Sequence, residues 1–276
     1  MKTGIQHNKL RASLPMYDWP EVQAHNDQFW KTLREALQHY GFNGLPPTLT
    51  RPHSTQCWTS QNNGLSQTCG YPLKHELGHL VELLGTPTYD TQYCNNGYYA
   101  SVILTRREDS RSSINEFQYA KPAVNGLNSQ SGYNALVSLV GDMKTPDTQQ
   151  YFASPLISGS HRQSILAVAE RRAELCAVDP VSWKLAQQFE KASAKLSVLC
   201  LTSYTPALPL ISSTKFANRF SGSLGSGPLA LKETVARAWI DAINYDQTTA
   251  QKLLINGITM IERDAYLAVE GHNNVL

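Results

Sequence analysis

The chain has 276 residues, of which 41% are hydrophobic and 17% are charged. This length corresponds to about two domains, and the composition excludes a largely disordered chain. The 24 Lys and Arg residues against 22 Asp and Glu residues give a net charge of +2, and no basic run is interleaved with aromatic residues. Nucleic acid is therefore not an expected partner. No stretch approaches the ~18 uninterrupted apolar residues of a spanning helix, so we expect no insertion into a membrane.

Apolar periodicity predicts an α/β chain in which short strands alternate with amphipathic helices. In the first part of the chain the predicted elements are a strand over 10–17, a helix over 21–40, a strand near 64–68, a helix over 72–84 and a strand over 98–105. Those of the second part are a strand over 119–124, a helix from about 131, a helix over 161–172, a strand over 173–178, a helix over 182–191 and a strand over 196–202. Segment 219–228 predicts a flexible connection, and two helices close the chain.

Cysteines and the first residues bear on the cellular compartment. The five cysteines are too few and too scattered for a disulfide scaffold. Cys69 and Cys94 lie in glycine-containing turn sequence, and they either pair in an oxidising compartment or remain free thiols. The first fifteen residues lack the apolar core and cleavage site of an export signal. We therefore expect either a chain that stays inside the cell or one whose leader has been removed.

An HExxH motif occupies residues 75–79 on the predicted helix over 72–84. His75 and His79 would share one face of a regular helix and bind zinc, with Glu76 as the general base. A catalytic zinc needs a third protein ligand, and no histidine follows His79 until His161. A surface helix with two solvated histidines is the simpler interpretation, and a zinc hydrolase stays an alternative.

Two junctions lead from a predicted strand into a helix and carry small polar residues: 67–72 and 128–133. The start of a helix has unpaired backbone N–H groups and a partial positive charge, so hydroxyls gathered there favour an anion. Serine and asparagine are also ordinary helix caps. The residues thus predict either caps or an anion site that needs no cation.

His161 opens a predicted helix, and Asp179 follows a predicted buried strand. Together with Ser129 or Ser131 they would make a nucleophile–His–Asp hydrolase. No GxSxG sequence surrounds either serine, so the strained turn that presents such a nucleophile is missing. A binding role and a purely structural role remain for this pair.

Four short runs occur in the order and spacing of one protein family: NGYYAS at 96–101, NSQSGY at 128–133, GSHRQSILAV at 159–168 and AELCAVD at 173–179. From about Ser13 to Pro209 the chain resembles the phosphate-, phosphite- and phosphonate-binding receptors of ABC importers. The resemblance implies a type II periplasmic-binding-protein fold, with two α/β lobes joined by two crossing hinge strands. Lobe 1 is expected at 1–103 and 204–276, and lobe 2 at 104–203.

The resemblance also implies a ligand site. In such receptors a Ser-x-Ser helix start holds the phosphonate oxygens, which here falls on Ser129, Gln130 and Ser131. The family's tyrosine before the first crossing strand matches Tyr99 or its neighbour Tyr98. These residues are expected to bind the ligand through neutral donors.

Further site residues follow from the same resemblance. The anion-binding histidine of the family matches His161, and the acid that holds an amine in aminophosphonate receptors matches Asp179. We add Tyr17 and Thr68 because they stand at predicted strand ends. The chain departs from the aminophosphonate pattern at 205–210, where TPALPL contains no second acid. An amine would thus meet at most one carboxylate.

The expected function is that of a binding protein and not an enzyme. It would capture phosphate, phosphite, a phosphonate or a small phosphate ester between its lobes for ABC-type import, with no cofactor, no metal and no catalytic residue. The resemblance implies an ABC permease as partner and a periplasmic location, and we expect a monomer. The alternatives are a zinc hydrolase using 75–79, a hydrolase built on Ser131, and an intracellular, cytoplasmic sensor with the same fold.

Overall fold

The computed structural model describes residues 10–51, 56–141, 151–224 and 227–269. The chain divides into two compact units. Unit 1 comprises 1–68, 75–88 and 208–261, and unit 2 comprises 69–74, 89–207 and 262–276. Each unit has its own five-stranded sheet. The lobe boundaries expected from the sequence remain a prediction.

The sheet of unit 1 has the strand order β1-β2-β12-β3-β13. Strands β1 and β2 are parallel, and β12 is antiparallel to both of its neighbours. The bounds of these strands are Arg11–Ser13 for β1, Asn63–Gln67 for β2, Leu210–Ser213 for β12, Val81–Tyr89 for β3 and Ile255–Thr259 for β13. The sequence predicted β1 and β2 but neither β12 nor β13.

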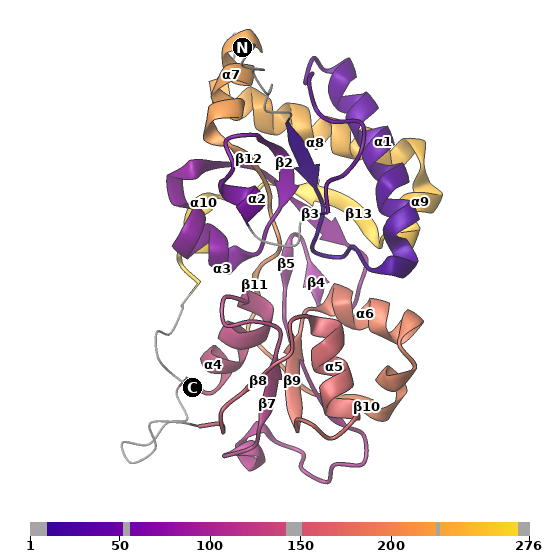
Figure 1. Cartoon of the computed structure of the whole chain (residues 1–276), viewed down its shortest axis with the longest axis vertical. Coiled ribbons are helices and arrows are strands. Elements are labelled where there is room, and N and C mark those ends of the chain that lie inside the picture. The colour runs from indigo at the N-terminus through magenta and orange to yellow at the C-terminus, as the bar shows by residue number, and fades with distance from the viewer. Residues whose placement is uncertain (1–9, 52–55, 142–150, 225–226, 270–276) are drawn as a thin grey trace, which may run out of the picture. The chain divides into compact units, whose positions relative to one another are not determined.

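Helices of unit 1 pack along this sheet. The predicted helix over 21–40 is confirmed as a short turn, η1 (Pro20–Val22), followed by α1 (Gln23–His39). Phe29 of α1 meets Trp239 edge-to-face with the ring centroids 4.9 Å apart. Trp239 belongs to the long helix that runs beside α1 (Figure 1). The remaining helices of this unit are α2 (Gln56–Thr59), α7 (Thr214–Leu224), α8 (Gly227–Tyr245) and α9 (Gln247–Lys252).

The predicted flexible connection over 219–228 is wrong for most of its length. Residues 219–224 form the end of α7, and 227–228 begin α8, while 225–226 lie outside the described residues. Phe220 is buried and stacks edge-on against Phe42 with a centroid distance of 4.3 Å. This apolar contact holds the segment as a helix despite its glycine and serine content.

The sheet of unit 2 has the strand order β10-β6-β9-β7-β8. Strands β7, β8 and β9 are mutually parallel, whereas β6 is antiparallel to β9 and to β10. The bounds are Val102–Arg106 for β6, Pro122–Val124 for β7, Leu156–Ile157 for β8, Leu175–Val178 for β9 and Leu196–Leu201 for β10. The predicted strand over 98–105 is in fact two strands, because Ala100 and Ser101 separate β6 from β5 (Tyr98–Tyr99).

A smaller sheet of unit 2 orders β11-β5-β4, where β11 is Thr205–Pro206 and β4 is Cys94–Asn95. Strands β4 and β5 form a hairpin whose two turn residues, Asn96 and Gly97, both have positive φ angles of 45° and 80°. An Asn-Gly pair is the sequence that such a turn favours. The pairing places Tyr99 opposite Cys94 on one side and Thr205 on the other.

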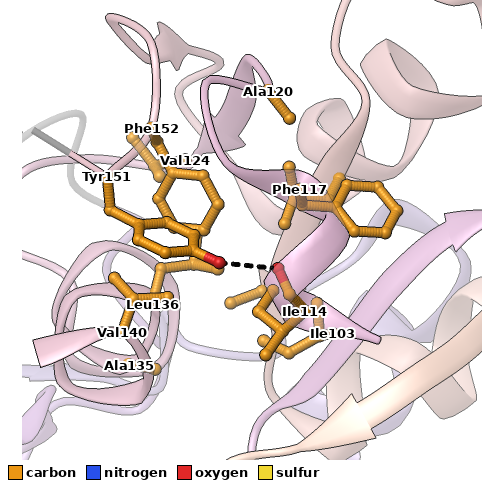
Figure 2. Packing of buried hydrophobic residues seen from close by; sticks show 12 residues of the cluster. Ile103, Ile114, Phe117, Ala120, Val124, Ala135, Leu136, Val140, Tyr151 and Phe152 are labelled. Atoms are coloured by element: carbon orange, nitrogen blue, oxygen red, sulfur yellow. Dashed lines mark hydrogen bonds between the residues drawn. The ribbon is translucent and has the colours of Figure 1, made fainter. Parts of the chain in front are cut away.

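Buried side chains on one face of the unit 2 sheet form a cluster with α4 (Ala135–Leu139) and η4 (Ile114–Phe117) (Figure 2). Leu175 and Ala177 of β9 belong to this cluster, so the alternate residues of that strand point to the opposite face. Helix α5 (His161–Ala169) packs there against β9, β7 and β6. The other helical elements of this unit are α3 (Gly70–Pro72), η5 (Gln130–Asn134), α6 (Pro180–Phe189), η7 (Lys191–Lys195) and α10 (Arg263–Leu267).

The α/β class predicted from periodicity is confirmed. Within the described ranges, no helix has both the length and the apolar character that crossing a membrane requires.

Candidate functional site

Three neighbouring parallel strands of unit 2, β8, β7 and β9, are each followed by the start of a helix. The carboxyl ends of parallel strands lie at one edge of a sheet, and this edge is where open α/β sheets bind ligands. The first turns after β7, β8 and β9 carry Ser131, His161 and Asp179 in that order. The topology therefore explains why residues 48 positions apart in sequence lie close together.

After β7, Ser129 is the residue before the helical turn η5. Its backbone is extended, with φ −91° and ψ 126°, and its Oγ accepts a hydrogen bond from the Gly132 N–H at 3.1 Å. The turn is a π-turn that runs directly into α4. A Cβ at Gly132 would lie 2.0 Å from Oδ1 of Asn125, a buried atom without a hydrogen-bond partner. Close approach of these groups thus requires glycine here.

His161 is the first residue of α5, which Ser160 caps by accepting a hydrogen bond from the Gln163 N–H at 3.2 Å. Gly159 precedes the cap with a φ of +88°, a conformation that favours glycine. The imidazole Nε2 of His161 lies 2.8 Å from Ser131 Oγ. The run GSH at 159–161 therefore combines a turn, a cap and a functional side chain.

Asp179 ends β9 and caps α6, with Pro180 at the first helical position. Its Oδ1 accepts a hydrogen bond from the Ser182 N–H at 2.9 Å. Its Oδ2 lies 3.4 Å from Nε2 of His161. Only 3% of Asp179 is exposed, so the carboxylate is held by the cap and the imidazole and not by water.

One nitrogen of His161, Nε2, faces both Ser131 and Asp179, and Nδ1 is buried without a partner. A hydrolase triad needs the serine on one ring nitrogen and the acid on the other, so that the acid orients the base. Here Ser131 and Asp179 face the same ring nitrogen, so the arrangement is not that of a hydrolase triad. The tautomer with a proton on Nε2 fits the carboxylate best, because a lone pair there would face a negative charge. Ser131 Oγ then accepts from the imidazole, and its own O–H is left to donate.

Tyr99 and Cys69 extend this polar group. Burial raises the pKa of Tyr99 well above its usual value, the neighbouring acidic groups Cys69 and Asp179 raise it further, and hydrogen bonds with Thr205 and Ser131 lower it. The Sγ of Cys69 accepts a hydrogen bond from the Gln130 N–H at 3.4 Å, and burial raises the pKa of its thiol. Both groups are therefore neutral donors at physiological pH.

Sequence reasoning missed Cys69 as part of this group. The junction over 67–72 pointed to this turn, but Thr68 was predicted there because it stands at a predicted strand end, and the neighbouring Cys69 was not. All five cysteines are free thiols in this structure, including Cys69 and Cys94. Burial raises the pKa of the Cys94 thiol to about 11, against a hydrogen bond from Thr91.

Electrostatics of the group rest on one carboxylate. Burial lowers the pKa of His161 below its usual value, while Asp179 and the Ala177 carbonyl oppose that shift. Asp179 contributes to the pKa shift of each of four groups: His161, Tyr99, Cys69 and Cys94. Neither a lysine nor an arginine is among the causes of these shifts. The described part of this site therefore offers neutral hydrogen-bond donors beside a single negative charge.

The remaining predicted site residues fall as follows. Gln130 and Ser131 lie in η5, Ser129 precedes it as the cap, and each is about 5–6% exposed. Tyr17 and Thr68 belong to unit 1. Their part in the site stays a prediction.

The predicted helix over 72–84 is confirmed only as far as Leu80 and is irregular, so it lacks the geometry on which the predicted zinc site depends. The helical segment ends at Leu80, and Val81 begins the strand β3. His75 lies in a π-turn over Leu73–Leu77, and Gly78 has a φ of +45°, so 75–79 does not form the regular helix that the motif needs. Among the described residues, no three His, Cys, Asp or Glu side chains gather as a metal site.

A family model described as the periplasmic substrate-binding protein of phosphonate ABC transporters matches residues 70–253. The fold is similar to that of PhnD1 from Prochlorococcus marinus in complex with methylphosphonate, with a TM-score of 0.67, 13% identity and 94% of each chain covered. It is also similar to a binding protein component of an ABC phosphonate transporter from Pseudomonas aeruginosa, with a TM-score of 0.63, 13% identity, and coverage of 93% of this chain and 82% of that one.

A third solved structure with this fold is the periplasmic aliphatic sulphonate binding protein SsuA from Escherichia coli, with a TM-score of 0.59, 14% identity, and coverage of 93% of this chain and 87% of that one. No curated protein matches the chain. Periplasmic binding proteins thus share the mixed α/β fold of this chain.

Proposed function

Because the chain belongs to the family of periplasmic substrate-binding proteins of phosphonate ABC transporters, we propose that it captures a phosphorus oxyanion for import. The ligand class comprises phosphate, phosphite, phosphonates and small phosphate esters. The family consists of binding receptors that serve ABC permeases, and it is periplasmic. For this chain, we propose the same location and a permease as its partner.

The convergence of Ser131, His161 and Asp179 at the carboxyl edge of β8, β7 and β9 carries this proposal. Ser129, Gln130 and Ser131 would bind oxyanion oxygens through hydroxyl and backbone N–H groups at the start of a helix. Hydrogen bonds to a charged group in a desolvated site contribute ~1.5–3 kcal/mol each, so neutral donors suffice for tight binding.

The remaining side chains have supporting roles in the proposed site. Tyr99 and Cys69 would add donors, since burial keeps both protonated. His161 would support the hydroxyl of Ser131, and Tyr17 and Thr68 would contribute from unit 1. Asp179 is available to a cationic amine on a phosphonate ligand, although its Oδ1 already caps α6.

Isothermal titration calorimetry with methylphosphonate, phosphite, phosphate and sulfate tests the proposal. We expect saturable binding of at least one phosphorus oxyanion. Ser131→Ala should weaken that binding about tenfold or more, because one hydrogen bond to the anion is lost. Ser138→Ala is the matched control, since Ser138 lies on α4 just beyond the same turn and is exposed.

The control variant should keep the affinity of the unmodified chain. Absence of saturable binding for all three phosphorus compounds, with the protein folded by circular dichroism, would overturn the proposal. Unchanged affinity in Ser131→Ala would overturn the assignment of the helix start.

A further inference from the structure

Among the described residues of the proposed site, none carries a fixed positive charge to match an oxyanion. Asp179 is buried and lies 3.4 Å from His161, and the other titratable groups of the site, Tyr99 and Cys69, are neutral acids. A phosphonate or phosphate dianion at Ser131 would stand close to this carboxylate. Unscreened like charges in a buried site repel strongly, so the complex needs a compensating positive charge.

His161 is the group in this site that is able to supply that charge. Its Nε2 already faces both Asp179 Oδ2 and Ser131 Oγ, which would each stabilise a proton there. Its Nδ1 is buried without a partner in the structure, and the carbonyl of Ala177 favours the protonated ring. A protonated ring would therefore be stabilised by the Asp179 carboxylate, the Ser131 hydroxyl and the Ala177 carbonyl.

Charged side chains on the elements around α5 do not compete for this role. Arg162 pairs with Glu190 at 3.2 Å, and Arg106 donates to the carbonyls of Val168 and Ala173 at the far end of α5. On the neighbouring α6 and η7, the lysines Lys184, Lys191 and Lys195 are exposed. The charge that acts on the imidazole is that of Asp179.

We propose that His161 is neutral in the free protein and takes up one proton when the oxyanion binds, so that capture is coupled to protonation. The bound state then holds an imidazolium between Asp179 and the anion. The proton comes from solvent, and no covalent bond other than N–H forms. Asp179 is a positioning residue in this scheme, because it acts on the ligand through the imidazole. This inference rests on the proposed function and adds the charge state of the ligand site.

Two measurements on the same samples test the coupling, with methylphosphonate as the first probe. Calorimetry at pH 8 in buffers of different ionisation enthalpy gives the number of protons taken up on binding. The ¹⁵N spectra of labelled histidine show which ring nitrogens carry protons, and His161→Gln identifies the His161 signals among the eight histidines. We expect an uptake between one half and one proton, and an imidazolium spectrum for His161 only in the complex.

Variants separate the contributions. His161→Gln should abolish the proton uptake, whereas His79→Gln, a substitution of an exposed histidine in unit 1, should leave it unchanged. Asp179→Asn keeps a helix cap, because asparagine caps as well as aspartate does. In that variant we expect His161 to remain neutral when methylphosphonate binds.

The outcomes distinguish this inference from the proposed function. Saturable binding without proton uptake would overturn the coupling and leave the receptor function intact. Proton uptake with a neutral His161 spectrum would place the proton on the ligand and would also overturn it. Failure of methylphosphonate, phosphite and phosphate to bind at all would instead overturn the proposed function.

Discussion

Ser129 and Ser131 are two positions apart and have different tasks. Ser129 Oγ accepts the Gly132 N–H and completes the start of the helix, whereas Ser131 Oγ meets the imidazole of His161. The Ser129 hydroxyl thus stabilises the helix start beside its proposed ligand role, and the Ser131 hydroxyl is the one that contacts His161. Substituting each in turn separates stability from binding.

Ser129→Ala should lower the free energy of unfolding by about 1 kcal/mol, because the Gly132 N–H loses its cap. For a protein of this size the melting temperature should fall by roughly 2–4 °C, measured without ligand by circular dichroism. Ser129→Thr is the control, since it keeps a hydroxyl, and it should retain most of the stability. An unchanged melting temperature in Ser129→Ala would show that the cap does not contribute.

The sequence predicted much of the site at residue scale but not all of it. Three residues stand out because each lies at the start of a helix after a strand: Ser131, His161 and Asp179. In the structure, Nε2 of His161 lies 2.8 Å from Ser131 Oγ and 3.4 Å from Asp179 Oδ2. Cys69 and Asn125 were missed. A thiol and an amide have no local signal, and their roles depend on contacts with residues remote in sequence, such as Gln130 for Cys69.

At the scale of elements, apolar periodicity located those helices and strands with a clear inside and outside. Helix α1 follows this pattern, with Phe29, Trp30, Leu33 and Leu37 all buried on one face. Strand β12 lies between two strands and is buried at all four positions, so it has no polar alternation to detect. The predicted helix over 72–84 extends into the first four residues of strand β3, because the run VELL at 81–84 is compatible with either period.

The cluster in Figure 2 joins α4, η4 and the loop before β8, and a side-chain hydrogen bond drawn there links this loop to η4. The hydroxyl of Tyr151 donates to the carbonyl of Ile114 at 3.0 Å, and both residues are buried. Tyr151 also meets Phe152 edge-to-face with the ring centroids 5.0 Å apart. Tyr151 therefore contributes both an aromatic contact and a hydrogen bond to the cluster.

Tyr151→Phe separates these two contributions. The variant keeps the ring but leaves the buried Ile114 carbonyl without this donor, which should cost about 1–3 kcal/mol in the free energy of unfolding. Urea denaturation measures this. Tyr119→Phe is the matched control, since 63% of Tyr119 is exposed, and it should change the free energy by less than about 0.5 kcal/mol. Equal stability of the two variants would contradict a role for the hydrogen bond.

At the scale of the whole molecule, each unit is assembled from three separate stretches of the chain. Periodicity identifies elements one at a time and contains no information on which distant stretches share a sheet. Strands β2 and β12, for example, pair although residues 67 and 210 are far apart in sequence. The order of the predicted elements suggested two lobes, and the resemblance of four motifs to a receptor family gave that expectation its topology.

Stability of the whole chain should depend on pH through His161 in the mildly acidic range. Burial lowers the pKa of His161 in the folded state below the usual 6.5, so the unfolded chain binds this proton at a higher pH. The free energy of unfolding therefore falls as the pH drops below about 6.5, by at most about 1.4 kcal/mol per pH unit for one group, and the loss stops below the folded-state pKa.

This window is separate from that of the carboxylates. The Arg111 guanidinium lowers the pKa of Asp109, so the stabilisation from that pair is lost only as the pH falls through a value below 3.8.

Thermal unfolding between pH 7 and 5 should show a smaller loss of stability for His161→Gln than for the unmodified chain. His79→Gln, an exposed control, should follow the unmodified chain. Saturating methylphosphonate should also reduce the loss, since the complex already holds the proton on His161. Parallel pH profiles for the unmodified chain and His161→Gln would show instead that the buried imidazole is not the group that titrates.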